Sequence, residues 1–247
     1  MIKLIRPDKD PLLTDNEHLL TAEFECDTTR SKPVWDKDYI KTPLFRMTHE
    51  KCAYCETPSD CLEVDHFLCK SKHPHLVVDW DNLFPACEYC NKKAKKDIDC
   101  KKEPIIDPCN DNPAYHLVFR NMLYMPKIFG NVIARNTIKL LKLNNRPALS
   151  KTYGSIVDAV NEKLEMYTNE INNIDDKSRI DKMDFADRFI KFMKLAQPEH
   201  AYSAIYATSM VTNPDYEGLK SLLRKKKIWN SKKMQPLDDT INAIALK

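Results

Sequence analysis

The sequences CAYC at residues 52–55 and CEYC at residues 87–90 enclose the stretch that decides the fold. Each C-x-x-C pair can present two thiolates to one ion from a tight turn, and two pairs complete the tetrahedral thiolate set that zinc prefers. Chance spacing and redox-active dithiols are the alternatives, but two pairs favour a structural zinc. We therefore predict one closed zinc site, which performs no chemistry and has four ligands, Cys52, Cys55, Cys87 and Cys90.

The residues between the two pairs read LEVDHFLCKSKHPHLVVDWDNLFPA (62–86). Apolar and polar residues alternate over 62–65, which predicts a short half-buried strand that ends at His66. A second short strand is expected over residues 77–84, and this strand would hold Asn82.

A short basic helix, NKKAKK (91–96), is expected after the second pair and begins with Asn91. Phosphodiester hydrolysis needs a base that deprotonates water and a divalent cation that stabilises negative charge. Imidazole titrates near about pH 6.5, so His66 is a candidate base, while Asp65 and Asn91 offer oxygens that suit Mg2+ or Mn2+. Neighbours on a strand point to opposite faces, so Asp65 and His66 converge only if the strand ends or bends there.

These motifs resemble the HNH endonucleases of the ββα-metal type over about residues 50–97. The resemblance implies that His66 is the general base and that Asp65 and Asn91 bind the catalytic ion. It also implies that Asn82, the middle asparagine, braces the loop that bears the base. Asn91 replaces the histidine that names the family, a variant that keeps an oxygen ligand. No glycine follows the lysines after Asn91, so the helix is expected to run differently there.

Three further runs are similar to the PtuB-type HNH proteins of Septu and retron-linked anti-phage systems. They are HPHLVVDWDNLFPAC (73–87), IIDPCNDNPAYHL (105–117) and TIKLLKLNN (137–145). The resemblance implies that the nuclease works with a PtuA-like ATPase of the ABC/SMC kind.

Glycine is scarce, with three residues in a chain of 247. The chain has no G-x-G-x-x-G turn and no G-x-x-x-x-G-K-[ST] loop, so it cradles no nucleotide phosphates by those means. If this system uses ATP, the ATP belongs to a partner.

Nine cysteines accompany an N-terminus without an apolar signal segment, and no stretch approaches the ~18 apolar residues that span a bilayer. We therefore expect a cytoplasmic protein with no membrane contact, in which clustered cysteines bind metal rather than form disulfides. The net charge of +3 says little about partners.

The chain is expected to be an α+β protein in three parts. Residues 1–48 would form an N-terminal extension that packs on the core, and residues 49–120 the HNH core braced by zinc. Residues 131–247 would form a helical subdomain with a possible partner-docking role. Apolar residues at steps of three and four predict a long helix whose buried stripe is Ile156, Val160, Leu164, Tyr167, Ile171 and Ile174. Prolines at 198, 214 and 236 are expected to open later helices.

Several residues keep competing interpretations. The basic run 219–233, with Trp229 inside it, could contact nucleic acid, dock a partner or form a solvated helix end. The lysines at 92–102 could neutralise phosphates or form a solvated face. Asp107 and His116 lie in the run 105–117 that resembles the family, and either a functional or a structural role is open for them. We expect His73 and His75 to be solvated loop residues. The cysteines expected to be buried or free thiols are Cys61, Cys69, Cys100 and Cys109.

Three hypotheses for the function follow from these observations. The first is metal-dependent hydrolysis of DNA or RNA. The second is a zinc-finger module that binds nucleic acid without cutting it. The third is an interaction subunit whose nuclease core is dormant alone.

Overall fold

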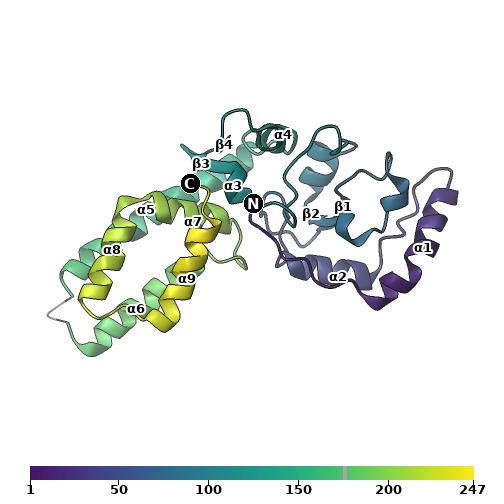
Figure 1. The fold of residues 1–247 in the computed structure, drawn as a ribbon. Helices are drawn as coiled ribbons and strands as arrows, with labels where there is room; N and C mark the ends of the chain where they lie inside the picture. Colours follow the sequence, from purple (N-terminus) through teal and green to yellow (C-terminus); the bar gives the residue numbers. More distant parts are fainter. Residues whose placement is uncertain (175–176) are drawn as a thin grey trace. The chain divides into compact units, whose positions relative to one another are not determined.

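The computed structural model describes residues 1–174 and 177–247, which fall into two compact units (Figure 1). Unit 1 comprises Met1–Asn112 and Ile128–Leu143, and unit 2 comprises Pro113–Lys127 and Asn144–Lys247. The functional division into an extension, a core and a helical subdomain stays a prediction.

Unit 1 has a two-stranded sheet surrounded by helices and turns. The strands are antiparallel, and their register pairs Glu63 with Ala86 and His66 with Leu83. The elements of unit 1 are α1 (Pro11–Cys26), α2 (Asp38–Met47), β1 (Glu63–His66), the 3-10 turns η1 (Pro74–Leu76) and η2 (Trp80–Asn82), β2 (Leu83–Ala86), the π-helix η3 (Tyr89–Lys95) and α4 (Val132–Leu140).

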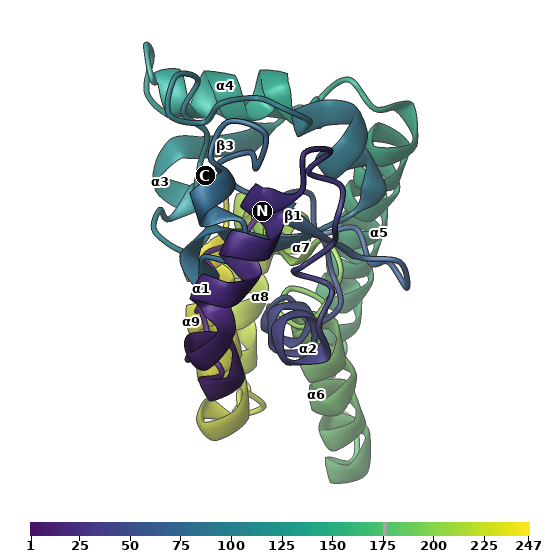
Figure 2. The same ribbon diagram turned by 90° about the vertical axis from the view of Figure 1, so that its right-hand side faces the viewer.

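The core of unit 1 lies where the N-terminal helices meet the sheet and its connecting loop. Helix α1 begins at Pro11 because the Asp10 side chain accepts a hydrogen bond from the Leu12 amide and Pro11 suits the first turn. Helices α1 and α2 lie beside each other in unit 1 (Figures 1 and 2). Their apolar faces join residues of the sheet and loop in one buried cluster, Leu13, Leu20, Phe24, Val34, Ile40, Leu44, Val64, Val77, Val78, Trp80 and Leu83. Since each such side chain contributes about 1.5–3 kcal/mol when buried, the N-terminal segment is part of the fold that carries the sheet.

Unit 2 is mostly helical. Its elements are α3 (Pro113–His116), the antiparallel hairpin β3 (Leu117–Arg120) and β4 (Leu123–Pro126), α5 (Pro147–Asn172), α6 (Arg179–Lys194), α7 (Ser203–Thr212), α8 (Pro214–Lys225) and α9 (Ser231–Ile244). The apolar stripe predicted from the sequence is buried along α5 and just beyond its end. Aromatic rings of α5 and α6 pack edge to face, with Tyr167 at 5.5 Å from both Phe185 and Phe189.

The α+β class with a helical C-terminal region is confirmed, but some element boundaries were wrong. The strand expected over 77–84 begins only at Leu83, because the Asp79 side chain accepts hydrogen bonds from the Asp81 and Asn82 amides and caps a 3-10 turn. Pro214 opens α8 as expected, whereas α7 begins at Ser203 rather than Pro198. Pro236 lies inside α9, which begins at Ser231 after the capping residue Asn230.

Within the described ranges 1–174 and 177–247, no helix combines the length and apolar character required to cross a membrane.

Candidate active site

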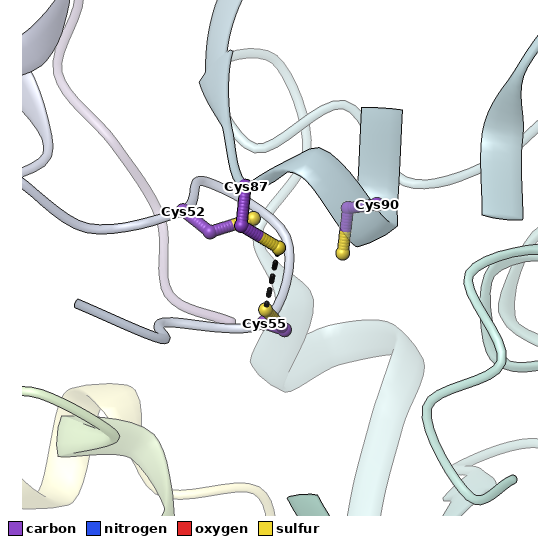
Figure 3. A group of neighbouring side chains, drawn as sticks. All are labelled: Cys52, Cys55, Cys87 and Cys90. Carbon is purple, nitrogen blue, oxygen red and sulfur yellow. Dashed lines mark hydrogen bonds between the residues drawn. The ribbon is translucent and has the colours of Figure 1, made fainter. Parts of the chain in front are cut away.

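The four cysteines of the two C-x-x-C pairs meet in one buried cluster. Their Sγ atoms all lie within 4.8 Å of one another, and the Cys55 and Cys87 sulfurs are 3.8 Å apart (Figure 3). The first pair belongs to the turn at 52–55, whereas Cys87 directly follows β2 and Cys90 lies in the first turn of η3. A hydrogen bond of 2.9 Å from the Ala53 amide to the Pro85 carbonyl holds the two segments together.

Burial and the hydrogen bonds within this cluster separate the pKa values of its thiols. Hydrogen bonds with the thiols of Cys52, Cys87 and Cys90 hold the pKa of Cys55 well below its ordinary value. Burial raises the pKa of Cys52 well above its ordinary value. Thiolates are the form that binds metal, and four sulfurs at this separation are the donor set of a structural metal site.

The two sides of β1 carry different chemistry. The side that faces η3 holds Glu63 and Asp65, which alternate along the strand as expected. Asp65 is 2% exposed, and its Oδ2 accepts a hydrogen bond of 2.5 Å from the Tyr54 hydroxyl. Its Oδ1 lies 3.1 Å from the Nζ of Lys95, which also donates to the His66 carbonyl at 2.5 Å. Asp65 is therefore a buried carboxylate already paired with an ammonium group.

His66 points to the other side of β1. Its Nε2 lies 2.8 Å from the Val77 carbonyl, and a carbonyl can only accept a hydrogen bond. Nε2 therefore carries the proton, and Nδ1 keeps the lone pair that a base needs. Burial lowers the pKa of His66 to about 4, despite the opposing effect of the Asp65 charge. The imidazole is consequently neutral at neutral pH.

Asn82 holds the loop between β1 and β2 in place. Its Oδ1 accepts a hydrogen bond of 2.7 Å from the Leu68 amide. Its Nδ2 donates to the carbonyls of Leu68 at 3.1 Å and Leu76 at 2.9 Å. Leu76 directly precedes Val77, so Asn82 also fixes the backbone segment that holds the imidazole.

A cavity of about 770 Å³ lies beside β1 and brings His66 and Asn91 together. Asn91 donates from Nδ2 to Oε2 of Glu63 at 2.9 Å, and Lys92 pairs with the same carboxylate. Glu63, Lys70 and Lys96 also line the cavity, whereas Asp65 does not. The arrangement combines an available base, a carboxylate, an amide and ammonium groups in one cavity.

The sequence motifs overlooked Glu63 and Trp35, and the expectation of a phosphate contact or a solvated position was wrong for Lys95, which is buried and pairs with Asp65. Glu63 could have been recognised, because it lies two positions before Asp65 and a strand places such residues on one side. Lys95 lies four residues after Asn91 and reaches Asp65 because η3 is a wide turn, with the Lys96 amide bonded to the Asn91 carbonyl. Trp35, whose ring lies 4.7 Å from that of His66, had no local signal because the contact is long-range.

Several residues with open interpretations now have contacts. His73 is not a solvated loop residue, since its Nε2 lies 3.1 Å from Asp99. His75 is exposed, as expected. Asp107 accepts hydrogen bonds from the Cys109 and Asn110 amides, which favours its structural role.

The remaining cysteines differ in how exposed they are, and the basic run 219–233 contains a contact between a cation and an aromatic ring. Cys69 and Cys100 are buried, Cys109 is partly buried and Cys61 is exposed. Within the basic run, the guanidinium of Arg224 lies 4.4 Å from the centre of the Trp229 ring.

Known proteins match both the cavity region and the whole chain. The HNH endonuclease family matches residues 52–97, which include the cysteine cluster, His66 and Asn91. Septu protein PtuB of Bacillus thuringiensis is 36% identical over 97% of this chain and 93% of that protein. Septu protein PtuB of Bacillus mycoides (strain KBAB4) is 24% identical over 59% of this chain and 64% of that protein.

The ββα arrangement and the matched motifs define the class of this protein as an HNH endonuclease, an enzyme whose substrate is nucleic acid. Within that class, the chain belongs to the Septu protein PtuB family.

Proposed function

We propose that this chain is the nuclease subunit of a Septu-type anti-phage defence complex and that it hydrolyses phosphodiester bonds with the help of a divalent cation. One observation carries the proposal: a neutral histidine, His66, keeps an available Nδ1 in a cavity shared with Asn91. The similarity to Septu protein PtuB over nearly the whole chain supports the defence role.

His66 would act as the general base. Its Nδ1 takes a proton from the attacking water, whose oxygen bonds to phosphorus as the bond to the 3′ oxygen breaks. The 3′ oxygen would leave with the electron pair of the broken bond and take a proton from solvent water, so the products would carry 5′-phosphates and 3′-hydroxyl groups. The hydrogen bond to the Val77 carbonyl stabilises the correct tautomer and becomes stronger when the ring is protonated.

Asp65 and Asn91 would hold the catalytic Mg2+ or Mn2+, which supplies positive charge for the transition state. Asn91 suits such an ion, because its amide uses its nitrogen to bond Glu63 and so offers its oxygen. Glu63 adds a second carboxylate on the side of β1 that faces η3. To bind the ion, the Asp65 carboxylate would have to weaken its ion pair with Lys95.

The four cysteines would hold a structural Zn2+ with all four positions filled by protein. The ion would fasten the start of η3, and with it Asn91, to the turn at 52–55. Asn82 would brace the loop behind His66 through its three hydrogen bonds.

An ABC/SMC-type ATPase, PtuA-like, would be the partner of this chain. The chain has only three glycines and no glycine-rich phosphate loop, so ATP binding by that means falls to another subunit. An interaction subunit that stays dormant alone fits the same proposal, since the partner would then control when the site acts.

Cleavage of plasmid DNA and of RNA, with and without the ATPase, tests the proposal. Wild-type protein should cleave one of them in Mg2+ or Mn2+ and stop in excess EDTA. His66→Ala should lower the rate by roughly 10²–10⁴-fold, as expected for loss of a general base. The matched control is His75→Ala, because His75 is an exposed histidine of the same loop.

Each alternative predicts a different result in these assays. Equal cleavage by His66→Ala and wild type would refute the assignment of the base. Cleavage in EDTA would refute metal dependence. Binding of nucleic acid by protein that retains its zinc, with no cleavage under any added divalent ion, would favour the zinc-finger binding module.

A further inference from the structure

One wall of the cavity beside His66 comes from the N-terminal segment, outside the residues that match the HNH family. This wall consists of Pro33, Trp35, Asp36, Lys41 and Phe45. Phe45 and Trp35 also pack against the buried cluster of unit 1, so the wall is anchored to the core.

Trp35 is the residue of this wall that contacts His66. The two rings meet edge to face, with centroids 4.7 Å apart and an interplanar angle of 85°. The ammonium of Lys70 lies 5.1 Å from the centre of the same tryptophan ring. On the core side, Phe24 of α1 contacts Trp35 with a centroid distance of 6.0 Å. The indole therefore joins the core, the candidate base and a cavity lysine.

The backbone around Trp35 is held in a compact turn. The Asp36 amide donates to the Pro33 carbonyl at 2.8 Å, and the Lys37 amide donates to the Trp35 carbonyl at 2.9 Å. Val34, beside Trp35, is 4% exposed and belongs to the core cluster. The backbone on both sides of Trp35 is thus held in place.

We propose that Trp35 is a positioning residue of the nuclease site. Its ring holds the imidazole of His66 against the Val77 carbonyl and holds the Lys70 ammonium at the cavity, where a substrate phosphate would bind. This inference rests on the proposed function, and it makes the N-terminal segment a working part of the active site.

The physical need for this role follows from the contacts of His66. Among the described residues, the hydrogen-bond partner of its ring is the Val77 carbonyl at 2.8 Å. One hydrogen bond fixes a direction but leaves the ring free to tilt about it. The edge of Trp35, nearly perpendicular to the imidazole plane, limits that tilt. A misplacement of about 1 Å at a reacting group can cost on the order of 100-fold in rate.

Trp35→Leu and Trp35→Phe separate positioning from simple burial. Leucine keeps apolar bulk on the core but removes the ring, whereas phenylalanine keeps an aromatic edge beside His66. We expect Trp35→Leu to lower kcat by roughly 10-fold to 100-fold. Trp35→Phe should recover most of kcat, and urea unfolding should show that both variants are folded.

Trp80→Phe is the matched control for loss of tryptophan packing. Trp80 belongs to the same core cluster and donates to the Pro7 carbonyl, but it does not line the cavity. Its substitution should change stability while kcat stays within about threefold of wild type. Equal kcat values for the Leu and Phe variants of Trp35, or an equal loss in Trp80→Phe, would overturn the proposal.

A readout independent of cleavage is the tautomer of His66. NMR of protein labelled with 15N-histidine should show an Nε2-protonated His66 in wild type and in Trp35→Phe. Trp35→Leu should show mixed or averaged tautomers, and an unchanged tautomer would count against positioning. Absence of cleavage by wild type with this tautomer pattern intact would instead refute the proposed function alone.

Discussion

Both units bury a triad of tyrosine, aspartate and lysine, but the two triads stand in different surroundings. In unit 1, Asp65 accepts from the Tyr54 hydroxyl and pairs with Lys95. In unit 2, Asp238 accepts from the Tyr216 hydroxyl at 2.9 Å and pairs with Lys220 at 2.9 Å. Burial raises the pKa of both tyrosines, so both hydroxyls stay protonated and donate.

The difference lies in what each triad connects. The unit 2 triad joins α8 to α9 among packed helices. The unit 1 triad joins a four-residue strand to a single wide turn, and its lysine also donates to the His66 carbonyl. The same side-chain chemistry is therefore a helix–helix contact in one unit and a support of the candidate active site in the other.

The largest expected effect on stability is that of the cysteine cluster, because unit 1 has few long helices or strands. Removal of the metal with a chelator, or Cys90→Ser, should unfold unit 1 while unit 2 stays folded. Structural zinc sites of this kind are worth on the order of 10 kcal/mol in folding free energy.

Hydrogen exchange followed by mass spectrometry measures this effect separately in each unit. Cys61→Ser is the control, since Cys61 is exposed and lies outside the cluster. Protection that survives in 52–100 after chelation, in protein that contains no zinc, would contradict the prediction.

The two triad lysines give the next largest effect. Lys95→Met and Lys220→Met should each lower the free energy of unfolding by about 3–5 kcal/mol, because each leaves a buried aspartate unpaired. Nuclease activity should fall further in Lys95→Met than in Lys220→Met when both are assayed at a temperature where they remain folded.

Urea unfolding and cleavage assays on the same samples test this pair. The double variant Lys220→Met with Asp238→Leu should recover most of the stability lost in Lys220→Met, since no charge is then left buried. Equal losses of activity in the two lysine variants would contradict a special role for the unit 1 triad.

Burial of His66 gives a smaller, pH-dependent effect. The pKa of His66 is lowered to about 4 in the folded protein, against about 6.5 in an unfolded chain. Between these values the unfolded state binds more protons, so the contribution of His66 to stability is complete above about pH 6.5 and declines as the pH falls toward 4.

The slope cannot exceed about 1.4 kcal/mol per pH unit for one group. Denaturant unfolding of wild type and His66→Gln at pH 7.5, 6 and 5 isolates this contribution. Parallel pH profiles for the two proteins would show that His66 does not titrate as we infer.

The smallest effect is expected for the surface ion pairs of unit 2. Arg188 of α6 pairs with Glu170 of α5 and with Asp184, but all three side chains are partly or largely exposed. Arg188→Ala should cost about 0.2–1 kcal/mol in thermal or urea unfolding. The neighbouring Phe189→Ala, which empties a buried site, should cost about 3–5 kcal/mol. Similar costs for the two would mean that charge, not aromatic packing, stabilises this helix pair.

Local spacing in the sequence was enough to predict the cysteine cluster, since two residues between cysteines allow both sulfurs of a turn to reach one ion. The stripe on α5 was predictable for the same reason, because helical periodicity places every third or fourth residue on one side. The strand expected over 77–84 begins only at Leu83. The apolar residues before it are buried although they belong to a loop, and the Asp79 side chain caps the turn in that loop.

By itself, the sequence determined the class of protein and the four cysteines that meet in the cluster. Only the tertiary structure decided that Asp65 and His66 lie on opposite sides of β1, that Lys95 neutralises Asp65, and that Trp35 reaches His66. The physical reason is the range of the contacts. Motif spacing encodes contacts made within a turn or strand, whereas the pairing of a buried charge and the packing of an indole depend on segments that meet only after folding.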